Sequence, residues 1–264
     1  MRVLVMGATG FIGRALIPRL QCDRHAVVAW VRSPARARGL LGAEVELVHA
    51  DTAPDGLVEA IDRSDAVVNL AGEPLMGGRW TAARRAVLEG SRIAVTEQLV
   101  RAMAEAKTRP RVFVSGSAVG YYGDQADELL TEASSGGDDF LARLCRRWES
   151  AAEDAHRLGV RVVLLRTGVV LGRAGGALAQ MLPPFQIGVG GARRIGRAVP
   201  AVDSSPRSRE DHRRRACRRA VSWAGQWRGA GAGDEPLVRA RARARPSSPG
   251  HRSAAGAGAQ GDLR

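Results

Sequence analysis

Short apolar runs alternate with amphipathic stretches along the first 172 residues of the chain. Six runs have the character of buried strands, at residues 1–6, 26–31, 45–49, 65–72, 111–115 and 160–166. Between them, apolar positions recur every three or four residues at 11–20, 81–106 and 138–158. Strands that alternate with helices and show no hairpin signals predict an α/β fold built on a doubly wound parallel sheet.

The apolar periodicity stops near residue 192. From residue 193 the sequence consists largely of arginine, alanine, glycine, serine and proline, with Arg-Ala repeated through residues 239–245. Such a segment cannot bury enough apolar surface to offset the entropy of ordering it. We therefore expect residues 193–264, the tail, to be disordered.

The net charge of +13 belongs to this tail rather than to the patterned part of the chain. Residues 1–192 carry 23 basic and 21 acidic side chains, whereas residues 193–264 carry 17 basic and 6 acidic ones. An arginine-rich arm attracts phosphate backbones without sequence preference. We expect nucleic acid to bind only nonspecifically, through the tail.

The sequence carries no signal for a membrane span, a secretory leader or a metal site. No apolar run approaches the ~18 residues of a membrane helix, and the N-terminus lacks a basic segment and a cleavage site ahead of the first strand. The three cysteines lie far apart and lack the spacing of metal ligands. We expect a cytoplasmic protein that contacts no membrane.

The first strand leads into a glycine turn, Gly7-Ala-Thr-Gly-Phe-Ile-Gly13, which opens a helix. Gly7 permits a tight turn, Gly10 lets the backbone approach a pyrophosphate, and Gly13 lets the helix pack against the strand. The helix N-terminus adds free N–H groups and the positive end of a dipole. We predict a dinucleotide cofactor on this loop, with Thr9, Phe11 and Ile12 among its contacts; an ordinary turn is the alternative.

Two further strand ends bear on the cofactor. Arg32 follows the second strand, where an arginine suits a 2′-phosphate and so favours NADP over NAD, unless it is only a solvated side chain before a proline turn. Asp51 follows the third strand and is a further candidate contact, although it or Thr52 also suits the cap of a short helix.

The fourth strand ends in Leu70, Ala71 and Gly72. Small residues at such an end leave room for a cofactor where open α/β sheets bind ligands. Glu73 follows directly and either contacts the ligand or is solvated.

The fifth strand supplies the candidate chemistry. It ends in Ser115-Gly-Ser-Ala-Val-Gly-Tyr-Tyr-Gly123, which places serines next to two tyrosines. Ser117 and Tyr122 are the polar groups suited to catalysis. The alternative is a loop whose hydroxyls make only structural hydrogen bonds.

Taken together, the motifs resemble one known family. They comprise the glycine turn, Asn69-Leu-Ala-Gly-Glu73, the serine–tyrosine segment, Cys145-Arg-Arg-Trp-Glu149, Arg166-Thr-Gly-Val-Val-Leu-Gly172 and Leu182-Pro-Pro-Phe185. This set resembles the NAD(P)-dependent epimerase/dehydratase branch of the short-chain dehydrogenase/reductases, and within it the atypical epimerase-like oxidoreductases of unassigned substrate. The resemblance covers residues 1 to about 191.

The resemblance implies a Rossmann domain that binds NADP, with the phosphates on the glycine turn. Ala71, Gly72 and Ser115 would lie beside the ribose and nicotinamide. The implied reaction is hydride transfer between the nicotinamide and a carbonyl or hydroxyl carbon of a small or nucleotide-linked substrate. Ser117 would hydrogen-bond the substrate oxygen, and Tyr122 would donate the proton.

One departure from the superfamily concerns the proton donor. Its usual Tyr-x-x-x-Lys pair is absent, and the corresponding positions fall at Leu141 and Cys145. The atypical subgroup itself tends to lack this pair. The alternative to an enzyme is a non-catalytic dinucleotide-binding module, either a redox sensor or a degenerate gene product.

A second departure concerns the C-terminal part. Relatives continue into a small substrate lobe, which is missing or disordered here. We expect a NADP-binding Rossmann domain at 1–172, the start of a lobe segment at 173–192, and the tail at 193–264. We hypothesise that the tail is frameshifted: a single-base correction of the gene should restore a family-like lobe, and an intact reading frame would exclude the idea. The sequence specifies neither the substrate nor the oligomeric state.

Overall fold

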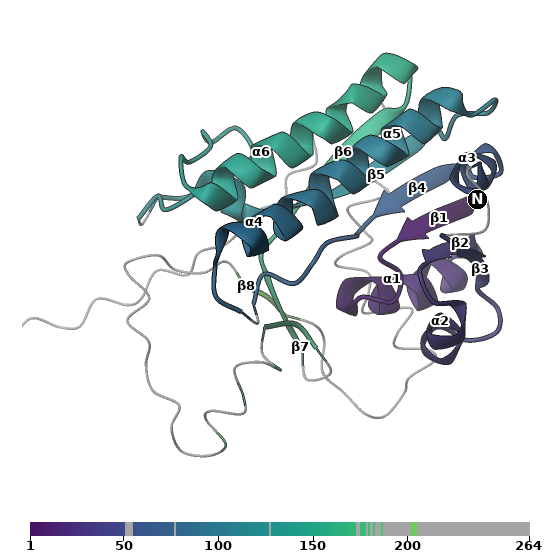
Figure 1. Cartoon of the computed structure of the whole chain (residues 1–264), viewed down its shortest axis with the longest axis horizontal. Helices are drawn as coiled ribbons and strands as arrows, with labels where there is room; N and C mark the ends of the chain where they lie inside the picture. The colour runs from purple at the N-terminus through teal and green to yellow at the C-terminus, as the bar shows by residue number, and fades with distance from the viewer. Residues whose placement is uncertain are drawn as a thin grey trace, which may run out of the picture.

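The central sheet is built from six parallel strands in the order β3-β2-β1-β4-β5-β6 (Figure 1). The computed structural model describes residues 1–50, 55–76, 78–126, 128–172, 175–177, 179, 182, 186 and 202–204. The strands are β1 (Arg2–Met6), β2 (Ala26–Val31), β3 (Glu46–His49), β4 (Ala66–Asn69), β5 (Val112–Ala118) and β6 (Arg161–Thr167). Every neighbouring pair is parallel, which confirms the predicted doubly wound sheet of the Rossmann type.

Helices cover both faces of the sheet, so most strand residues are buried and apolar. One face packs against α1 (Phe11–Cys22) and α2 (Pro34–Leu41), through core residues such as Ile17 and Ala37. The other packs against α3 (Gly56–Asp62), α5 (Val95–Glu105) and α6 (Phe140–Glu153), with the fully buried Phe113 in its core.

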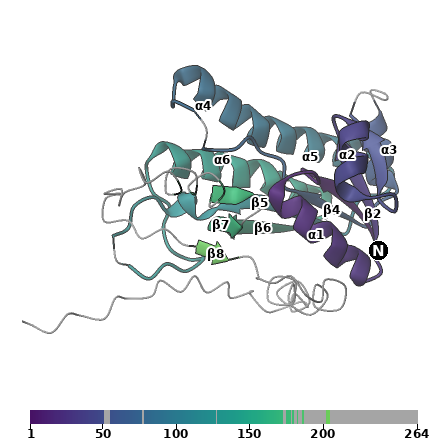
Figure 2. The same ribbon diagram turned by 90° about the horizontal axis from the view of Figure 1, so that it is seen from below.

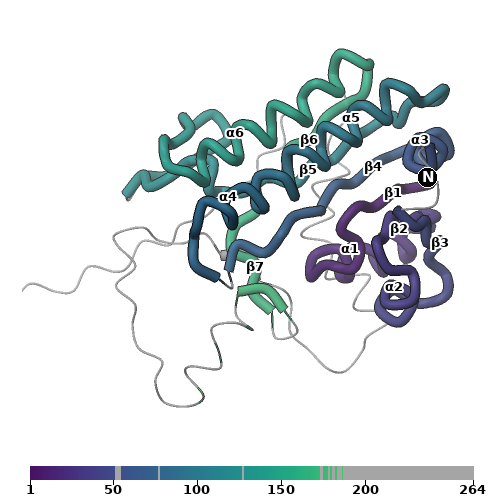
Figure 3. Tube along the Cα trace, viewed as in Figure 1, coloured from purple at the N-terminus to yellow at the C-terminus, as the bar shows by residue number. Residues whose placement is uncertain are grey.

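The amphipathic stretch at residues 81–106 forms one continuous helix with a π-helical turn in its middle. α4 (Ala82–Glu89) runs through the π-helix η1 (Gly90–Ala94) into α5, as the backbone trace in Figure 3 shows. Short turns of π-helix inside α-helices are frequent at functional sites. Here the π-turn carries Ser91 and Arg92 towards the loop that follows β4.

Two helices depart from the sequence expectations. Arg32-Ser33-Pro34 was expected to form a turn, but Pro34 begins α2, where the fixed φ of proline suits the first helical position. The cap expected at Asp51 or Thr52 is not that of α3, which begins at Gly56 after Asp55 and has no side-chain cap. Asp51 and Thr52 themselves lie outside the described residues.

A second, two-stranded sheet lies beyond the carboxyl ends of the central strands (Figures 1 and 2). β7 (Val169–Gly172) pairs in parallel with β8 (Val202–Ser204). β8 lies within the tail, whose other residues fall outside the described part of the chain, so the expected disorder of residues 193–264 stays a prediction. Along the described part of the chain, no helix is both long and apolar enough to cross a membrane.

Candidate cofactor and active site

The two predicted cofactor segments leave the sheet at neighbouring strand ends. β1 and β4 are paired, with Met6 opposite Asn69, and the chain continues from these ends into residues 7–13 and 70–73. The strand order reverses here, because β2 and β3 lie on one side of β1 and the other strands on its far side. Open α/β sheets bind ligands outside the carboxyl ends of their strands at such a switch point.

The glycines of the turn are required by close backbone packing. Gly7 has φ +72°, and a Cβ there would lie 2.5 Å from the Leu70 carbonyl oxygen and 2.8 Å from the Ala71 nitrogen. A Cβ on Gly13 would lie 2.5 Å from the Gly7 carbonyl oxygen. The turn, the start of α1 and the loop after β4 therefore touch backbone to backbone, which no other residue type permits.

The N-terminus of α1 is open to a ligand. Gly10 is the exposed N-cap, it makes no side-chain cap, and the first turn contains no acidic residue. Thr9, Phe11 and Ile12 are partly exposed around it. The N–H groups of the first helical turn and the positive dipole end therefore lack an acceptor from a capping side chain, which suits them to a phosphate.

Arg32 lies beside this loop, because β2 is the neighbour of β1 and Met6 pairs with Trp30. Its carbonyl oxygen accepts a 3.0 Å hydrogen bond from His49 Nε2. Its side chain is exposed, and the guanidinium makes no hydrogen bond or ion pair with any described residue. The charge is therefore available to a ligand phosphate.

A buried asparagine shapes the start of the loop after β4. Asn69 is fully buried, and its Oδ1 accepts a 3.1 Å hydrogen bond from the Ala71 nitrogen. Its Nδ2 donates to Thr96 Oγ1 at 2.9 Å, and Trp148 Nε1 donates to the same oxygen at 3.0 Å. One hydroxyl on α5 thus joins β4 to α6 and fixes where Ala71 lies.

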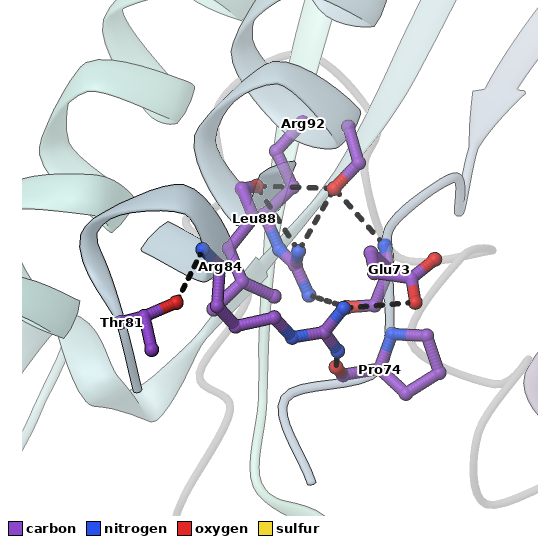
Figure 4. Close-up of polar contacts among 7 residues, drawn as sticks. Glu73, Pro74, Thr81, Arg84, Leu88 and Arg92 are labelled. Carbon is purple, nitrogen blue, oxygen red and sulfur yellow. Dashed lines mark hydrogen bonds and ion pairs between the residues drawn. The ribbon is translucent and has the colours of Figure 1, made fainter. Parts of the chain in front are cut away.

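Side chains of α4 and η1 hold the far end of the loop after β4 through hydrogen bonds and an ion pair (Figure 4). The Glu73 nitrogen donates to Ser91 Oγ at 3.0 Å, and Arg92 Nη2 donates to the Glu73 carbonyl oxygen at 2.9 Å. The Glu73 carboxylate, predicted to contact ligand or solvent, pairs with Arg84 at 3.1 Å. Burial lowers the pKa of the Arg92 guanidinium, which lies against Gly72. The charged side chains of Arg84 and Arg92 thus hold the loop after β4 in place through Glu73.

The two serines of β5 differ in their surroundings. Ser115 is fully buried opposite Asn69, and its hydroxyl donates to the Gly116 carbonyl oxygen at 3.3 Å. Ser117 lies further along the strand, and its hydroxyl donates to Glu149 Oε1 at 2.5 Å. That Ser115 lies beside the ribose and nicotinamide stays a prediction.

An ion pair between the partly buried Arg166 and the buried Glu149 connects the two predicted catalytic residues. Arg166 donates from Nε to Glu149 Oε1 at 2.8 Å and from Nη2 to Glu149 Oε2 at 2.7 Å. Its Nη1 donates to the Tyr122 hydroxyl at 2.9 Å. Hydrogen bonding to Glu149 raises the pKa of Arg166. Ser117 and Tyr122 thus both hydrogen-bond to the same ion pair, Ser117 to Glu149 and Tyr122 to Arg166.

The helix positions of the missing Tyr-x-x-x-Lys pair do lie against the serine–tyrosine segment. A Cβ on Gly120 would be 3.4 Å from Leu141 Cβ and 4.0 Å from Cys145 Sγ. Burial, followed by the charge of Glu149, raises the pKa of the Cys145 thiol to about 11. Cys145 is therefore a neutral thiol at neutral pH, and the charged group of this helix face lies one turn later, at Glu149.

The segment after β6 runs from this cluster back to the glycine turn. Thr167 Oγ1 donates to the Ser117 carbonyl oxygen at 3.1 Å. After β7, Gly172 bridges to Gly175, whose Cβ would lie 2.6 Å from the Phe11 ring. The glycine turn and the Ser117–Tyr122 cluster thus share the carboxyl edge of one sheet.

Sequence reasoning assigned no role to Glu149 or Arg166. Each carried a signal: Glu149 falls one helical turn after Cys145 on the apolar stripe of α6, and Arg166 ends an apolar strand. Charged residues are almost never buried unless paired, so opposite charges in adjacent buried elements indicate an ion pair. The sequence provides a weaker indication of the hydrogen bonds that join Asn69, Thr96 and Trp148.

Comparisons with known proteins agree with this geometry. Residues 3–183 match the model of the NAD dependent epimerase/dehydratase family. The chain is 44% identical over 195 residues to an epimerase family protein, the chloroplastic SDR39U1 homolog of Arabidopsis thaliana, and 41% identical over 197 residues to SDR39U1 of Bos taurus. The crystal structure of human SDR39U1 (isoform 2) with NADPH has a TM-score of 0.61 and 35% identity.

These matches cover much of this chain but less of its relatives. The two curated proteins are matched over 72% of this chain and over 55% and 62% of their own lengths. The human structure is matched over 77% of this chain and 66% of that one. A nucleoside-diphosphate sugar epimerase from Corynebacterium glutamicum, with a TM-score of 0.56 and 33% identity, is matched over 71% and 38%.

Replacing Gly13 by alanine should destabilise the fold. The new Cβ would meet the carbonyl oxygens of Gly7 and Ala8 at 2.5 and 2.6 Å, and overpacking of this kind costs about 1–3 kcal/mol. Gly39 in α2 is the matched control: it is exposed with open space around it, so alanine there should stabilise by ~0.5–1 kcal/mol. Urea unfolding measures both, and a Gly13→Ala variant as stable as the parent chain would contradict the packing described.

Cys145 should resist alkylation at about pH 8, where a thiol with a pKa of about 11 is only ~0.1% thiolate. Labelling with iodoacetamide, followed on the Cys145 peptide by mass spectrometry, should accelerate as the pH approaches that pKa. Glu149→Gln removes a charge that raises the pKa, so it should speed labelling at the lower pH. Labelling of the parent chain as fast as that of free glutathione would rule out the buried, Glu149-facing thiol.

Proposed function

Since the chain belongs to the NAD dependent epimerase/dehydratase family, we propose that it binds NADP(H) at the carboxyl edge of its sheet and transfers hydride there. The observation that carries the proposal is the glycine turn, packed against the loop after β4 and leading into an uncapped helix N-terminus. A pyrophosphate fits this surface because it needs close backbone approach, N–H donors and a positive field.

The preference for NADP rests on Arg32. Its exposed guanidinium beyond β2 suits a ribose 2′-phosphate, which it can bind through charge-assisted hydrogen bonds. The human SDR39U1 structure, 35% identical to this chain, is described with NADPH, which supports the same choice here. Leu70, Ala71, Gly72 and Ser115 would then line the path of the cofactor towards the Ser117–Tyr122 cluster.

The proposed chemistry is reversible reduction of a carbonyl. NADPH, when bound, supplies a hydride to the carbonyl carbon, and the oxygen takes up a proton. Ser117 would hydrogen-bond that oxygen once its hydroxyl proton turns away from Glu149 Oε1, to which it donates in the free chain, and Tyr122 would supply the proton. A nucleotide-linked substrate is supported by the likeness to the Corynebacterium nucleoside-diphosphate sugar epimerase, although any small polar carbonyl compound satisfies the same chemistry.

A non-catalytic dinucleotide-binding module is the second candidate. The observation in its favour is the apolar pair, Leu141 and Cys145, at the positions where the superfamily carries its tyrosine and lysine. The chain also spans only 55–62% of the curated relatives reported above. Oxidation of NADPH with a carbonyl probe such as 9,10-phenanthrenequinone separates the two candidates, because a binding module turns over nothing.

The cofactor proposal predicts tighter binding of NADPH than of NADH to the full chain, measured by nicotinamide fluorescence. Arg32→Asp should weaken NADPH binding about 10- to 100-fold, since a hydrogen bond to a charged group contributes about 1.5–3 kcal/mol, and should leave NADH almost unchanged. Arg101→Asp is the matched control, because it makes the same charge change on an exposed face of α5 near the opposite end of the sheet.

Equal affinity for the two nucleotides would remove Arg32 from the cofactor site. Failure to bind either of them would leave the glycine turn as an ordinary turn and would overturn the proposed function.

A further inference from the structure

The Arg166 guanidinium is held by hydrogen bonds and by ring contact, although part of the side chain is exposed. Two nitrogens, Nε and Nη2, form a fork with the Glu149 carboxylate at 2.8 and 2.7 Å. Its Cζ lies 3.5 Å from the centroid of the Tyr121 ring, and Nη1 also donates to the Glu132 carbonyl oxygen at 3.3 Å. The remaining Nη1–H is directed at the Tyr122 hydroxyl, 2.9 Å away. A planar guanidinium clamped in this way presents one donor in a fixed direction.

We infer that Arg166, oriented by Glu149, is the positioning residue that prepares the Tyr122 hydroxyl to exchange a proton with a substrate oxygen. It thereby takes the place of the lysine of the absent Tyr-x-x-x-Lys pair. The inference rests on the proposed hydride transfer, because only that reaction requires a proton at the oxygen.

The direction of the hydrogen bond is what makes Tyr122 a proton donor. Arg166 can only donate, so the Tyr122 oxygen accepts and its own proton takes no part in the bond. When a carbonyl carbon gains hydride, the carbonyl π pair moves to oxygen, and that oxygen takes the Tyr122 proton. The phenolate left behind faces the guanidinium and must be reprotonated before the next turnover. In alcohol oxidation the same proton moves the other way.

Glu149 has two tasks in this arrangement. Glu149 is 5% exposed, and its carboxylate balances the charge of the partly buried Arg166. Its Oε1 also accepts the Ser117 hydroxyl at 2.5 Å. The two hydroxyls proposed to meet the substrate oxygen are therefore set by one ion pair, so loss of either charge should disturb both.

Tyr122 is surrounded by few other charges in the described part of the chain. Arg166 reaches it from β6, and Glu149 and Cys145 belong to the facing helix α6. Arg146, also on α6, lies nearer to Tyr121, since both flank the Cβ position of Gly136. Gln125, which is uncharged, donates to the Tyr122 carbonyl oxygen. Glu132, on the loop before α6, also lies near, since its carbonyl oxygen accepts from the Arg166 Nη1 that reaches Tyr122. Of these charged groups, Arg166 is the one bonded to the hydroxyl, and Glu149 is its ion-pair partner.

The test uses the fact that the chain has only two tyrosines. In a Tyr121→Phe background, which keeps a ring beneath Arg166, the near-ultraviolet absorbance of tyrosinate reports Tyr122 alone. Arg166→Gln should move the midpoint of its pH titration upward, and Arg166→Lys should restore most of that change. Glu149→Gln should move the midpoint downward, because Arg166 then acts on Tyr122 without compensation.

Opposite signs show that both charges act on the Tyr122 hydroxyl of an intact site. A pair that only stabilises the fold would, when broken from either side, open the site to water and shift the midpoint in the same direction in both variants. That result, or an unchanged midpoint in Arg166→Gln, would overturn the inference. Thermal melting by circular dichroism identifies any unfolded variant, and if Arg166→Gln fails to fold, the sign of the Glu149→Gln shift decides.

The outcome is independent of the cofactor proposal. NADPH binding by the Tyr121→Phe chain tests the proposed function, whereas the titration needs no cofactor and no substrate. Opposite shifts without NADPH binding would leave the ion-pair geometry standing but would remove the proton-exchange role with the function it serves. NADPH binding without the opposite shifts would defeat the inference alone.

Discussion

The structure depends on three backbone segments meeting at one point beyond β1. Gly7 turns with φ +72° directly against the Leu70 carbonyl, and Gly13 brings the start of α1 against the same turn. Because β1 and β4 are adjacent parallel strands, this contact lies where the strand order reverses. The free helix N-terminus and the loop after β4 are consequences of that packing, and a side chain at either glycine would separate them.

The second organising interaction is electrostatic. Glu149 and Arg166 come from α6 and β6, and they join Ser117 to Tyr122 across the carboxyl ends of β5 and β6. An ion pair with one buried partner contributes little net stability, because the cost of desolvating its charges offsets their attraction. Its role here is to orient the Ser117 and Tyr122 hydroxyls at the carboxyl edge of the sheet. Thr167 and the segment after β7 connect this edge to the glycine turn. The proposed phosphate binding and the proposed proton chemistry would thereby lie at two ends of one surface.

Much of this architecture was predictable because it is local. Each of the six strands is a short apolar run, and the glycine turn is recognisable from strand, spacing and helix together. α2 was missed because Pro34 indicates a turn as readily as a first helical residue. The role of Glu73 was left open, since sequence alone does not reveal that Arg84 reaches its carboxylate from the next helix. Glu149 and Arg166 are 17 positions apart and meet only through the packing of α6 on the sheet.

The most direct test of the account is a crystal structure of the full chain with NADP⁺ bound. The account predicts the pyrophosphate over the Gly7–Gly13 turn, the 2′-phosphate against Arg32, and the nicotinamide ring on the side of Ser117 and Tyr122. A cofactor whose phosphates lie on the turn but whose nicotinamide points away from Ser117 would contradict the single shared site. The glycine turn would then be a nucleotide-binding element with no chemistry attached to the Glu149–Arg166 pair.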